Sequence, residues 1–329
     1  MTAGKAGLSV AVVEPTTLLG RDLKAVLKER HFPAAKIHLF HQTPQPGGIL
    51  TADDDEVAFV APLTPDALET CKIAFLCGSA ADTERFLATR ADSCLVIDLS
   101  GARHQGALAV PSEDGAPRAL PAGNVLVAPH PVAFVLAEAI AVVDALAPVA
   151  EATAAIDRPA SELGKAALDE LFEQAVALAA FRPVPKVAFG TQAAFNAFVP
   201  PDTDAFERRV AEDVAALLGR PFPLGVLSVR AGIFHGHLIR LDLRLASDAP
   251  PGTAVLDAFR AKKSAFDVVD PEDLSGPVES ASRDETLVLR VAASGRRVRL
   301  VLAADHMRRA GAILAVRLAE QALKERGIL

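Results

Sequence analysis

Residues 8–23 read Leu-Ser-Val-Ala-Val-Val-Glu-Pro-Thr-Thr-Leu-Leu-Gly-Arg-Asp-Leu. Residues 9–13 are a short β-branched run, which predicts a buried strand. The apolar residues that follow recur at helical spacing, which predicts a helix over 17–30: Leu18, Leu19, Leu23, Val26 and Leu27. The stretch is therefore a strand that runs directly into a helix, the unit from which α/β domains are built.

The same alternation continues through the first half of the chain. Further strands are expected at 36–40, 57–61, 73–77, 95–99 and 125–128, with a helix over 80–91. Strands that are apolar on both faces belong to parallel sheets with helices on each side. We therefore predict a doubly wound, Rossmann-like α/β domain for residues 1–130, completed by the last helix in residues 306–329.

Residues 131–305 have a different texture. After a helix over 132–146 come longer strands, expected at 149–156, 225–230, 238–245, 286–293 and 297–303. Helices are expected over 161–179, 204–218 and 253–261, and a last one over 307–326. The period-two alternation of residues 241–245 gives one polar and one covered sheet face, as in an α+β domain. Residues 44–48, 111–123 and 270–277 are expected to be loops.

The turn between the first strand and the first helix lacks the glycines that bind pyrophosphate. Gly20 alone keeps a place in the glycine pattern, where it allows close packing of helix and strand. Pro15 has no N–H to donate, and Glu14 puts a carboxylate where the anion would lie. Thr16 and Thr17 could instead cap the helix or hold a smaller anion. The turn therefore disfavours a dinucleotide in the usual pose.

Composition excludes several classes of partner. The net charge of −7, a pI near 5.7 and the absence of Trp and Tyr argue against a nucleic-acid role, and the apolar stretches carry charges that membrane spans lack. Three cysteines without metal-ligand spacing suit a reducing compartment, and no signal peptide is visible. We expect a cytoplasmic protein with no metal site.

Six segments, in this order and spacing, resemble the aspartate-semialdehyde dehydrogenase family over nearly the whole chain: Lys-Glu-Arg-His-Phe-Pro at 28–33, Val-Ile-Asp-Leu-Ser at 96–100, Gly-Lys-Ala-Ala-Leu-Asp-Glu-Leu at 164–171, Ala-Phe-Asn at 194–196, Val-Arg-Ala-Gly-Ile-Phe-His-Gly-His at 229–237 and Ala-Asp-His-Met-Arg-Arg-Ala-Gly-Ala at 304–312. The resemblance implies a semialdehyde-dehydrogenase-type fold with a central dimerisation domain, NADP as cofactor and a cysteine nucleophile. The family's cysteine opens a helix, and here Pro131 stands in its place.

Other positions that the resemblance implies are mixed. Arg230 and His237 keep the family's seven-residue spacing for the substrate carboxylate and for acid/base chemistry. The family's substrate-orienting Gln falls near Arg158, its Lys near Val214 or Ala215 and its phosphate-binding Arg near Arg103 or His104. On the cofactor side Gly20, Gly78 and Ser79 remain as a vestige, while Pro44 replaces a basic residue and His306 an Asn.

Three hypotheses remain open. The chain is a catalytically silent homologue that serves as an interaction protein and forms a homodimer, for which the apolar residues of strands 225–245 would suit the interface. Alternatively it is a semialdehyde dehydrogenase that uses NADP and an unaligned thiol, with Cys77 as the candidate. A third hypothesis is a sensor of a small anionic metabolite, either a carboxylate or a phosphorylated compound, held by Arg230, His237 and Arg103.

Overall fold

The computed structural model describes residues 7–42, 49–53, 56–90, 93–102, 106–112, 119–270 and 272–329. The chain divides into two compact units. Unit 1 comprises Met1–Pro129 and Gly311–Leu329, and unit 2 comprises His130–Ala310. Unit 2 is thus inserted in the sequence of unit 1.

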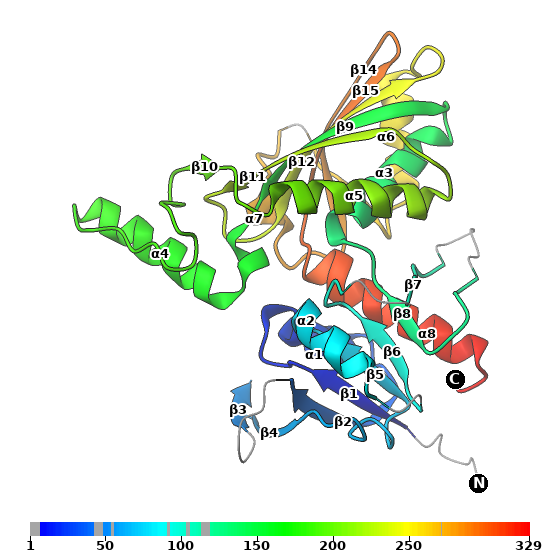
Figure 1. Ribbon diagram of the computed structural model, residues 1–329. Helices are drawn as coiled ribbons and strands as arrows, with labels where there is room; N and C mark the ends of the chain where they lie inside the picture. The colour runs from blue at the N-terminus through cyan, green and yellow to red at the C-terminus, as the bar shows by residue number, and fades with distance from the viewer. Residues whose placement is uncertain are drawn as a thin grey trace. The chain divides into compact units, whose positions relative to one another are not determined.

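Unit 1 is built on a sheet with the strand order β3-β4-β2-β1-β5-β6-β8-β7 (Figure 1). Its strands are β1 (Leu8–Val13), β2 (Ala34–His41), β3 (Ile49–Asp53), β4 (Glu56–Pro62), β5 (Ile73–Leu76), β6 (Leu95–Asp98), β7 (Ala107–Leu108) and β8 (Val125–Val127). All neighbouring pairs are parallel except β3 and β4, which are antiparallel at one edge. In the central strands, successive side chains point to opposite faces of the sheet and are buried on both faces, as the doubly wound prediction requires.

The helices of unit 1 are α1 (Leu18–Glu29), α2 (Ala80–Leu87) and α8 (Leu314–Glu325). Leu23, Val26 and Leu27 of α1 are buried at the helical spacing seen in the sequence. Phe86 of α2 joins a core cluster with residues of β1, β5 and β6. Arg30, directly after α1, pairs with Glu320 of α8 at 2.8 Å, so the last helix belongs to the same unit as the first.

Unit 2 contains a mixed sheet with the order β10-β11-β9-β12-β15-β14-β13. Its strands are β9 (Val149–Arg158), β10 (Ala197–Phe198), β11 (Leu224–Ala231), β12 (His237–Leu245), β13 (Phe266–Val268), β14 (Thr286–Ser294) and β15 (Arg297–Ala304). Helices α3 (Pro131–Asp144), α5 (Thr203–Leu218) and α6 (Gly252–Arg260) cover one face (Figure 1). The short helix α7 (Pro277–Ser280) precedes β14.

The other face of this sheet is polar. Arg240 pairs with Asp157, Arg244 with Glu151 and Arg297 with Asp242, each across neighbouring strands. The prediction that the apolar residues of strands 225–245 would suit a partner interface does not hold for the alternate apolar residues of β12. Ile239, Leu241, Leu243 and Leu245 point to the covered face, where the helices of the same unit bury them.

The predicted helix over 161–179 is in fact two pieces. A 3₁₀-helix, η1 (Ala160–Leu163), ends at Gly164, and α4 (Lys165–Ala179) begins one residue later. Gly164 has φ = 82°, a conformation that breaks a helix and that side chains disfavour. The last helix also begins irregularly, because residues Arg308–Ile313 form a π-helix before α8.

Candidate functional site

The turn between β1 and α1 is closed by its own side chains. Glu14 has φ = 59°, and its carboxylate accepts the backbone N–H of Gln42 at 2.6 Å. The Thr17 hydroxyl caps α1 by accepting from Gly20 N at 3.0 Å and donates to the Glu14 carbonyl at 2.8 Å. One free N–H of the first turn of α1, that of Gly20, is therefore capped by a side chain of the turn itself.

The glycines of the predicted cofactor vestige lie against this turn. A Cβ on Gly20 would lie 2.3 Å from the Glu14 carbonyl oxygen, so Gly20 serves close packing. A Cβ on Gly78 would meet the Gln42 side chain at 1.9 Å and Glu14 Cγ at 2.9 Å. Ser79 caps α2 through Asp82 N. The backbone at Gly78 is thus covered by protein atoms, and with Pro15 donating no hydrogen bond these residues do not fit a pyrophosphate in the usual pose.

The position to which the resemblance assigns the nucleophile, Pro131, lies at the start of α3 in unit 2. Pro131 is the first residue of this helix, and His130 caps it by accepting the Val132 N–H at 3.3 Å on Nδ1. The His130 N–H is in turn held by Asp213 of α5 at 2.8 Å. A helix N-terminus is present here, but the side chain on it is a saturated ring that cannot attack a carbonyl.

The three cysteines all belong to unit 1 and are buried. Burial, followed by the charges of Asp98 and Glu14, raises the pKa of Cys77 far above its ordinary value. Burial likewise raises the pKa of Cys94 to about 12 and also raises that of Cys71. A thiol must ionise to act as a nucleophile, so these surroundings oppose the hypothesis of an unaligned catalytic Cys77.

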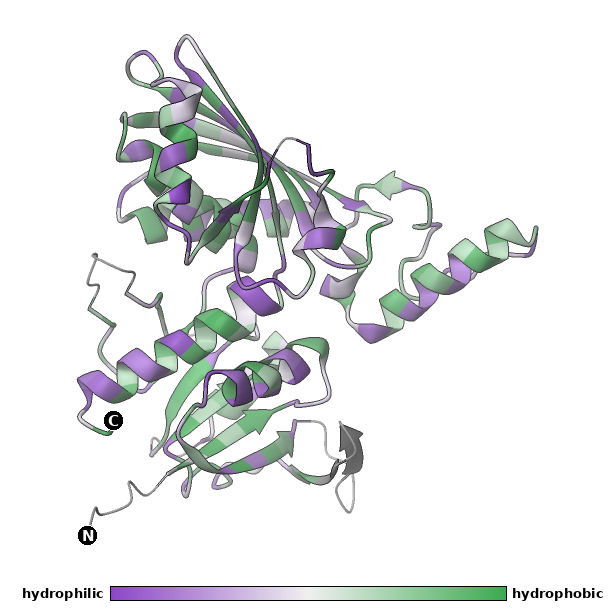
Figure 2. Ribbon diagram, turned by 180° about the vertical axis from the view of Figure 1, so that it is seen from behind, coloured by the Kyte–Doolittle hydropathy of each residue, from purple (hydrophilic) through white to green (hydrophobic). Residues whose placement is uncertain are grey.

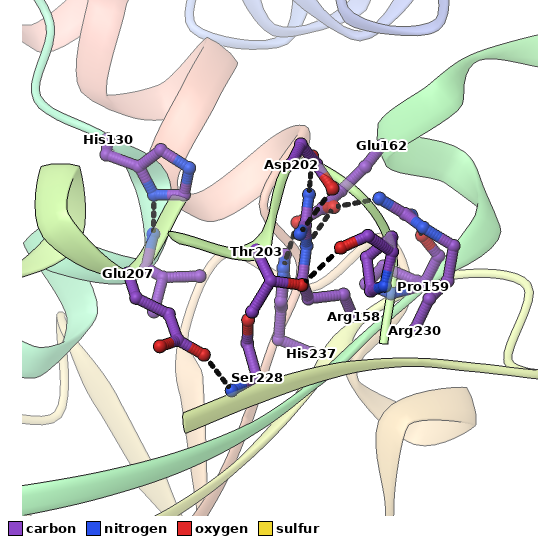
Figure 3. A network of polar contacts seen from close by, with 12 residues as sticks. His130, Arg158, Pro159, Glu162, Asp202, Thr203, Glu207, Ser228, Arg230 and His237 are labelled. Carbon is purple, nitrogen blue, oxygen red and sulfur yellow. Dashed lines mark hydrogen bonds and ion pairs between the residues drawn. The ribbon is translucent and has the colours of Figure 1, made fainter. Parts of the chain in front are cut away.

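Arg230 and His237 converge on a carboxylate that the sequence analysis did not single out. Glu162 of η1 receives His237 Nε2 at 2.7 Å on Oε1, and on Oε2 it accepts Arg158 Nε at 2.8 Å and Arg230 Nη2 at 3.1 Å (Figure 3). Arg158 ends β9, Arg230 lies in β11 and His237 begins β12. We call these four residues the Glu162 cluster.

The guanidinium groups of the cluster are fixed by further contacts. Arg158 forms a bidentate pair with Asp202, at 3.2 and 2.7 Å, and stacks 3.9 Å from the centre of the Phe206 ring. Arg230 donates to the Pro159 carbonyl at 2.8 Å. Because each guanidinium has at least two hydrogen-bond partners within the protein, both arginines are held in fixed orientations.

Electrostatics keep Glu162 ionised. Burial by itself would raise its pKa, but the hydrogen bond from His237 and the charges of His237 and Arg158 hold the pKa well below the ordinary value. Burial lowers the pKa of Arg230, and the negative charge of Glu162 partly offsets this lowering. A carboxylate and two guanidiniums are therefore charged together in a nearly water-free site.

His306 lies beside the cluster without a hydrogen bond. Its ring meets that of His237 edge to face, with centroids 4.9 Å apart, and both of its nitrogens are buried and unpaired. Burial, followed by the charge of His237, lowers the pKa of His306 to about 4. It is a neutral imidazole with unused hydrogen-bonding capacity next to Glu162.

The remaining predicted positions do not join the cluster. Val214 is part of the core, and Arg103, His104 and Pro44 lie outside the described residues. Glu162 and Asp202 were missed, although the four-residue spacing from Arg158 to Glu162 was a signal available in the sequence. In the described part of the chain no three His, Cys, Asp or Glu side chains gather as metal ligands would. Among the same residues, no helix has both the length and the hydrophobicity to cross a bilayer.

Known proteins resemble the chain over nearly its full length, although no family model matches it. It is 31% identical to the USG-1 protein homolog of Pseudomonas aeruginosa, over 96% of this chain and 98% of that protein. It is 25% identical to aspartate-semialdehyde dehydrogenase of Rickettsia typhi, over 95% of this chain and 97% of that protein.

Solved structures agree with these relatives. The structure of a probable aspartate-semialdehyde dehydrogenase from Pseudomonas aeruginosa superposes with a TM-score of 0.85 at 30% identity, covering 97% of this chain and 99% of that one. Aspartate semialdehyde dehydrogenase II from Vibrio cholerae, complexed with ASA, shares the fold with the same TM-score and coverage at 20% identity. The predicted fold and resemblance are thereby confirmed, and the chain belongs to the aspartate-semialdehyde dehydrogenase family.

Proposed function

We propose that this chain is a non-catalytic member of its family that works in the cytoplasm as an interaction or ligand-binding protein. The observation that carries the proposal is Pro131, which occupies the first position of α3 where the family's nucleophilic cysteine falls. The family reaction needs a thiolate to hold the acyl group, and proline has no atom that can do so. Losing a nucleophile costs about a millionfold in a well-studied serine protease.

Two further features support the same conclusion independently. Glu162 engages Arg230 and His237, the residues that the resemblance assigns to the substrate carboxylate and to proton transfer. Glu14 and Gln42 cover Gly78, and we infer that NADP is not a cofactor of this chain. The nucleophile position, the groups assigned to the substrate and the cofactor-binding turn therefore all differ from what the family reaction requires.

The direct test is an assay of NADP reduction with aspartate semialdehyde and phosphate. A family enzyme that retains the cysteine is the positive control. We expect no turnover above the protein-free blank. Turnover that disappears on thiol alkylation would overturn the proposal and restore the hypothesis of an unaligned thiol.

The variant Pro131→Cys separates the lost nucleophile from the other changes. A thiol at this helix N-terminus should be alkylated faster than the buried native cysteines, because the helix dipole lowers a thiol pKa. We still expect no turnover, since Glu162 and Glu14 remain in place. Activity in this variant would show that the nucleophile alone was missing.

We also propose that the chain forms a homodimer through unit 2. Large apolar side chains are exposed on β11, on the β10 segment and beyond the end of α4: Leu227, Phe195, Val199, Phe181 and Val187. Helix α4 extends away from the sheet, with hydrophobic residues alternating with polar ones along it (Figure 2). Exposed apolar groups in such numbers are typical of protein interfaces.

A further inference from the structure

The Glu162 cluster resembles an anion-binding site in which buried basic side chains surround a carboxylate. The side chains of Arg158, Arg230 and His237 are 5%, 2% and 2% exposed, whereas that of Glu162 is 13% exposed. The basic groups are thus the buried part and the carboxylate is the part nearer to solvent. In a purely structural ion pair nothing requires this arrangement, but it is what a site that receives an anion from outside needs.

The connection that carries Glu162 differs from the elements that carry the cations. Arg158, Arg230 and His237 lie on three strands of one hydrogen-bonded sheet, whereas Glu162 lies on a four-residue 3₁₀-helix. That helix is bounded by Gly164, whose positive φ ends it. The sheet therefore fixes the cations, and the acidic group is supplied by a short connection.

The anion is required by the charge balance of the cluster. Asp202 already takes both terminal nitrogens of Arg158, which leaves Glu162 as the carboxylate paired with Arg230. Without Glu162, a guanidinium and an imidazole would face each other in a buried site, at a large desolvation cost. Any small carboxylate that could enter would relieve this cost.

His306 adds a second observation that points to a ligand. It is 8% exposed, and neither ring nitrogen has a hydrogen-bond partner. Buried polar groups are almost always paired, so an imidazole left unpaired beside the cluster points to a hydrogen-bond partner that these protein groups do not supply.

We propose that Glu162 is a built-in ligand, whose carboxylate fills a carboxylate-binding site formed by Arg158, Arg230 and His237 and so excludes free carboxylates from it. This inference deepens the proposed function and rests on it. It also argues against the sensor hypothesis for the unmodified chain, because Arg230 and His237, two of the groups meant to hold the metabolite, are already engaged.

The test is rescue of a cavity by acetate, which matches the atoms that Glu162→Ala removes beyond Cβ. We expect the variant to unfold at a lower temperature than the wild type in chloride buffer. Sodium acetate should then raise its Tm saturably, by roughly 2–4 °C at ten times the Kd. The wild type should not respond beyond the effect of equal sodium chloride, and acetamide, which is neutral, should not replace acetate.

A matched control is Glu207→Ala. Glu207 accepts the Ser228 N–H at 2.6 Å in the same unit, so its loss also removes a carboxylate that holds backbone (Figure 3). This variant should lose stability but show no acetate-specific rise. A Tm of Glu162→Ala that responds equally to acetate and chloride would overturn the proposal.

If Glu162→Ala does not fold in chloride, its far-ultraviolet circular dichroism after refolding in acetate decides instead. Recovery of the native spectrum in acetate supports the proposal, and the absence of recovery overturns it. Neither readout depends on enzymatic activity. Failure of this inference is therefore distinguishable from failure of the proposed function, which the NADP assay tests.

Discussion

Two acidic side chains, one in each unit, stand where this fold would otherwise meet an anion. Glu14 occupies the turn in which dinucleotide-binding proteins hold pyrophosphate, and its carboxylate is bound by Gln42. Glu162 occupies the arginine site of unit 2. A fixed internal carboxylate removes the need for an external anion without rebuilding the surrounding fold, so both changes are compatible with an intact scaffold.

Glu14 leads to a prediction about nucleotides. We expect millimolar NADPH or NADH to leave the Tm of the wild type unchanged, because Glu14 and Gln42 cover the backbone at Gly78. A dinucleotide at a hundred times its Kd would add about 2.7 kcal/mol and be easily seen by dye-based thermal unfolding, which suits a chain without Tyr or Trp. A clear rise in Tm would show that the altered turn still binds the cofactor.

His306 leads to a prediction about pH. Its pKa falls from 6.5 to about 4 on folding, with His237, Glu162, Asp305 and His235 as the surrounding ionisable groups. Between these two pH values the unfolded chain binds a proton at His306 that the folded chain does not bind. The contribution of His306 to the free energy of unfolding is therefore fully present above pH 6.5 and is lost as pH falls toward 4. The loss from this group is about 3 kcal/mol.

The variant His306→Asn should flatten this dependence. Denaturant unfolding between pH 6.5 and 4.5 should show a smaller decline in the free energy of unfolding than in the wild type. Glu162 also destabilises the fold on protonation, but its pKa is lowered, so its effect falls below this window. Equal slopes in the two proteins would contradict the assignment to His306.

At the scale of elements, local pattern predicted most of the fold. The strands and helices of unit 1 follow the periodicity of residues 8–99, because buried strands and amphipathic helices leave strong signals. The Glu162 cluster could be predicted only in part. Arg230 and His237 were found through the resemblance, which assigns them by their place in the 229–237 segment, but Glu162 was read as part of a continuous helix over 161–179.

The missed carboxylate has a physical explanation. Gly164 ends η1 with a positive φ, and a single glycine inside a helical pattern does not reveal whether the helix continues. The contacts from Glu162 to Arg230 and His237 span 68 and 75 residues, and no local pattern specifies such pairings. Strand β3 was not predicted at all, and its antiparallel pairing with β4 is likewise a contact that no local pattern specifies.

Helix α4 holds its following loop through a buried polar network. Glu170 accepts the backbone N–H groups of Val187 and Ala188, both at 2.6 Å, and that of Phe189 at 3.2 Å. Gln174 donates to the Pro185 and Thr191 carbonyls and accepts from Ala193 and Ala194. Two side chains one helical turn apart thus fix ten residues of irregular backbone.

We expect Glu170→Ala to loosen this loop by about 1–3 kcal/mol, because three N–H groups lose their acceptor. Hydrogen exchange of residues 185–194 should accelerate roughly tenfold or more, while the sheet keeps its protection. The neighbouring variant Glu173→Ala removes an exposed carboxylate from the same helix and serves as control. Equal exchange in both variants would show that the loop is held by other contacts.

At the scale of the whole molecule, the proposed homodimer is the main prediction. Sedimentation equilibrium should give twice the 34.4 kDa of one chain. Leu227 is 65% exposed in β11, and Leu227→Arg should shift the protein toward monomer by placing a charge in the interface. Leu274→Arg, at a 95% exposed residue outside the sheet, should leave the mass unchanged. A wild type that sediments as a single chain would contradict the dimer.

The insertion of unit 2 into unit 1 also fixes the order in which the two units can be completed during synthesis. Ribosomes release the chain from its N-terminus, and unit 2 ends at Ala310, whereas unit 1 still lacks Gly311–Leu329 at that point. The missing piece contains α8, which pairs with the end of α1 through Glu320 and Arg30. The domain that starts first therefore finishes last, and a chain that stops translating at residue 310 would carry a whole second unit on an unfinished first one.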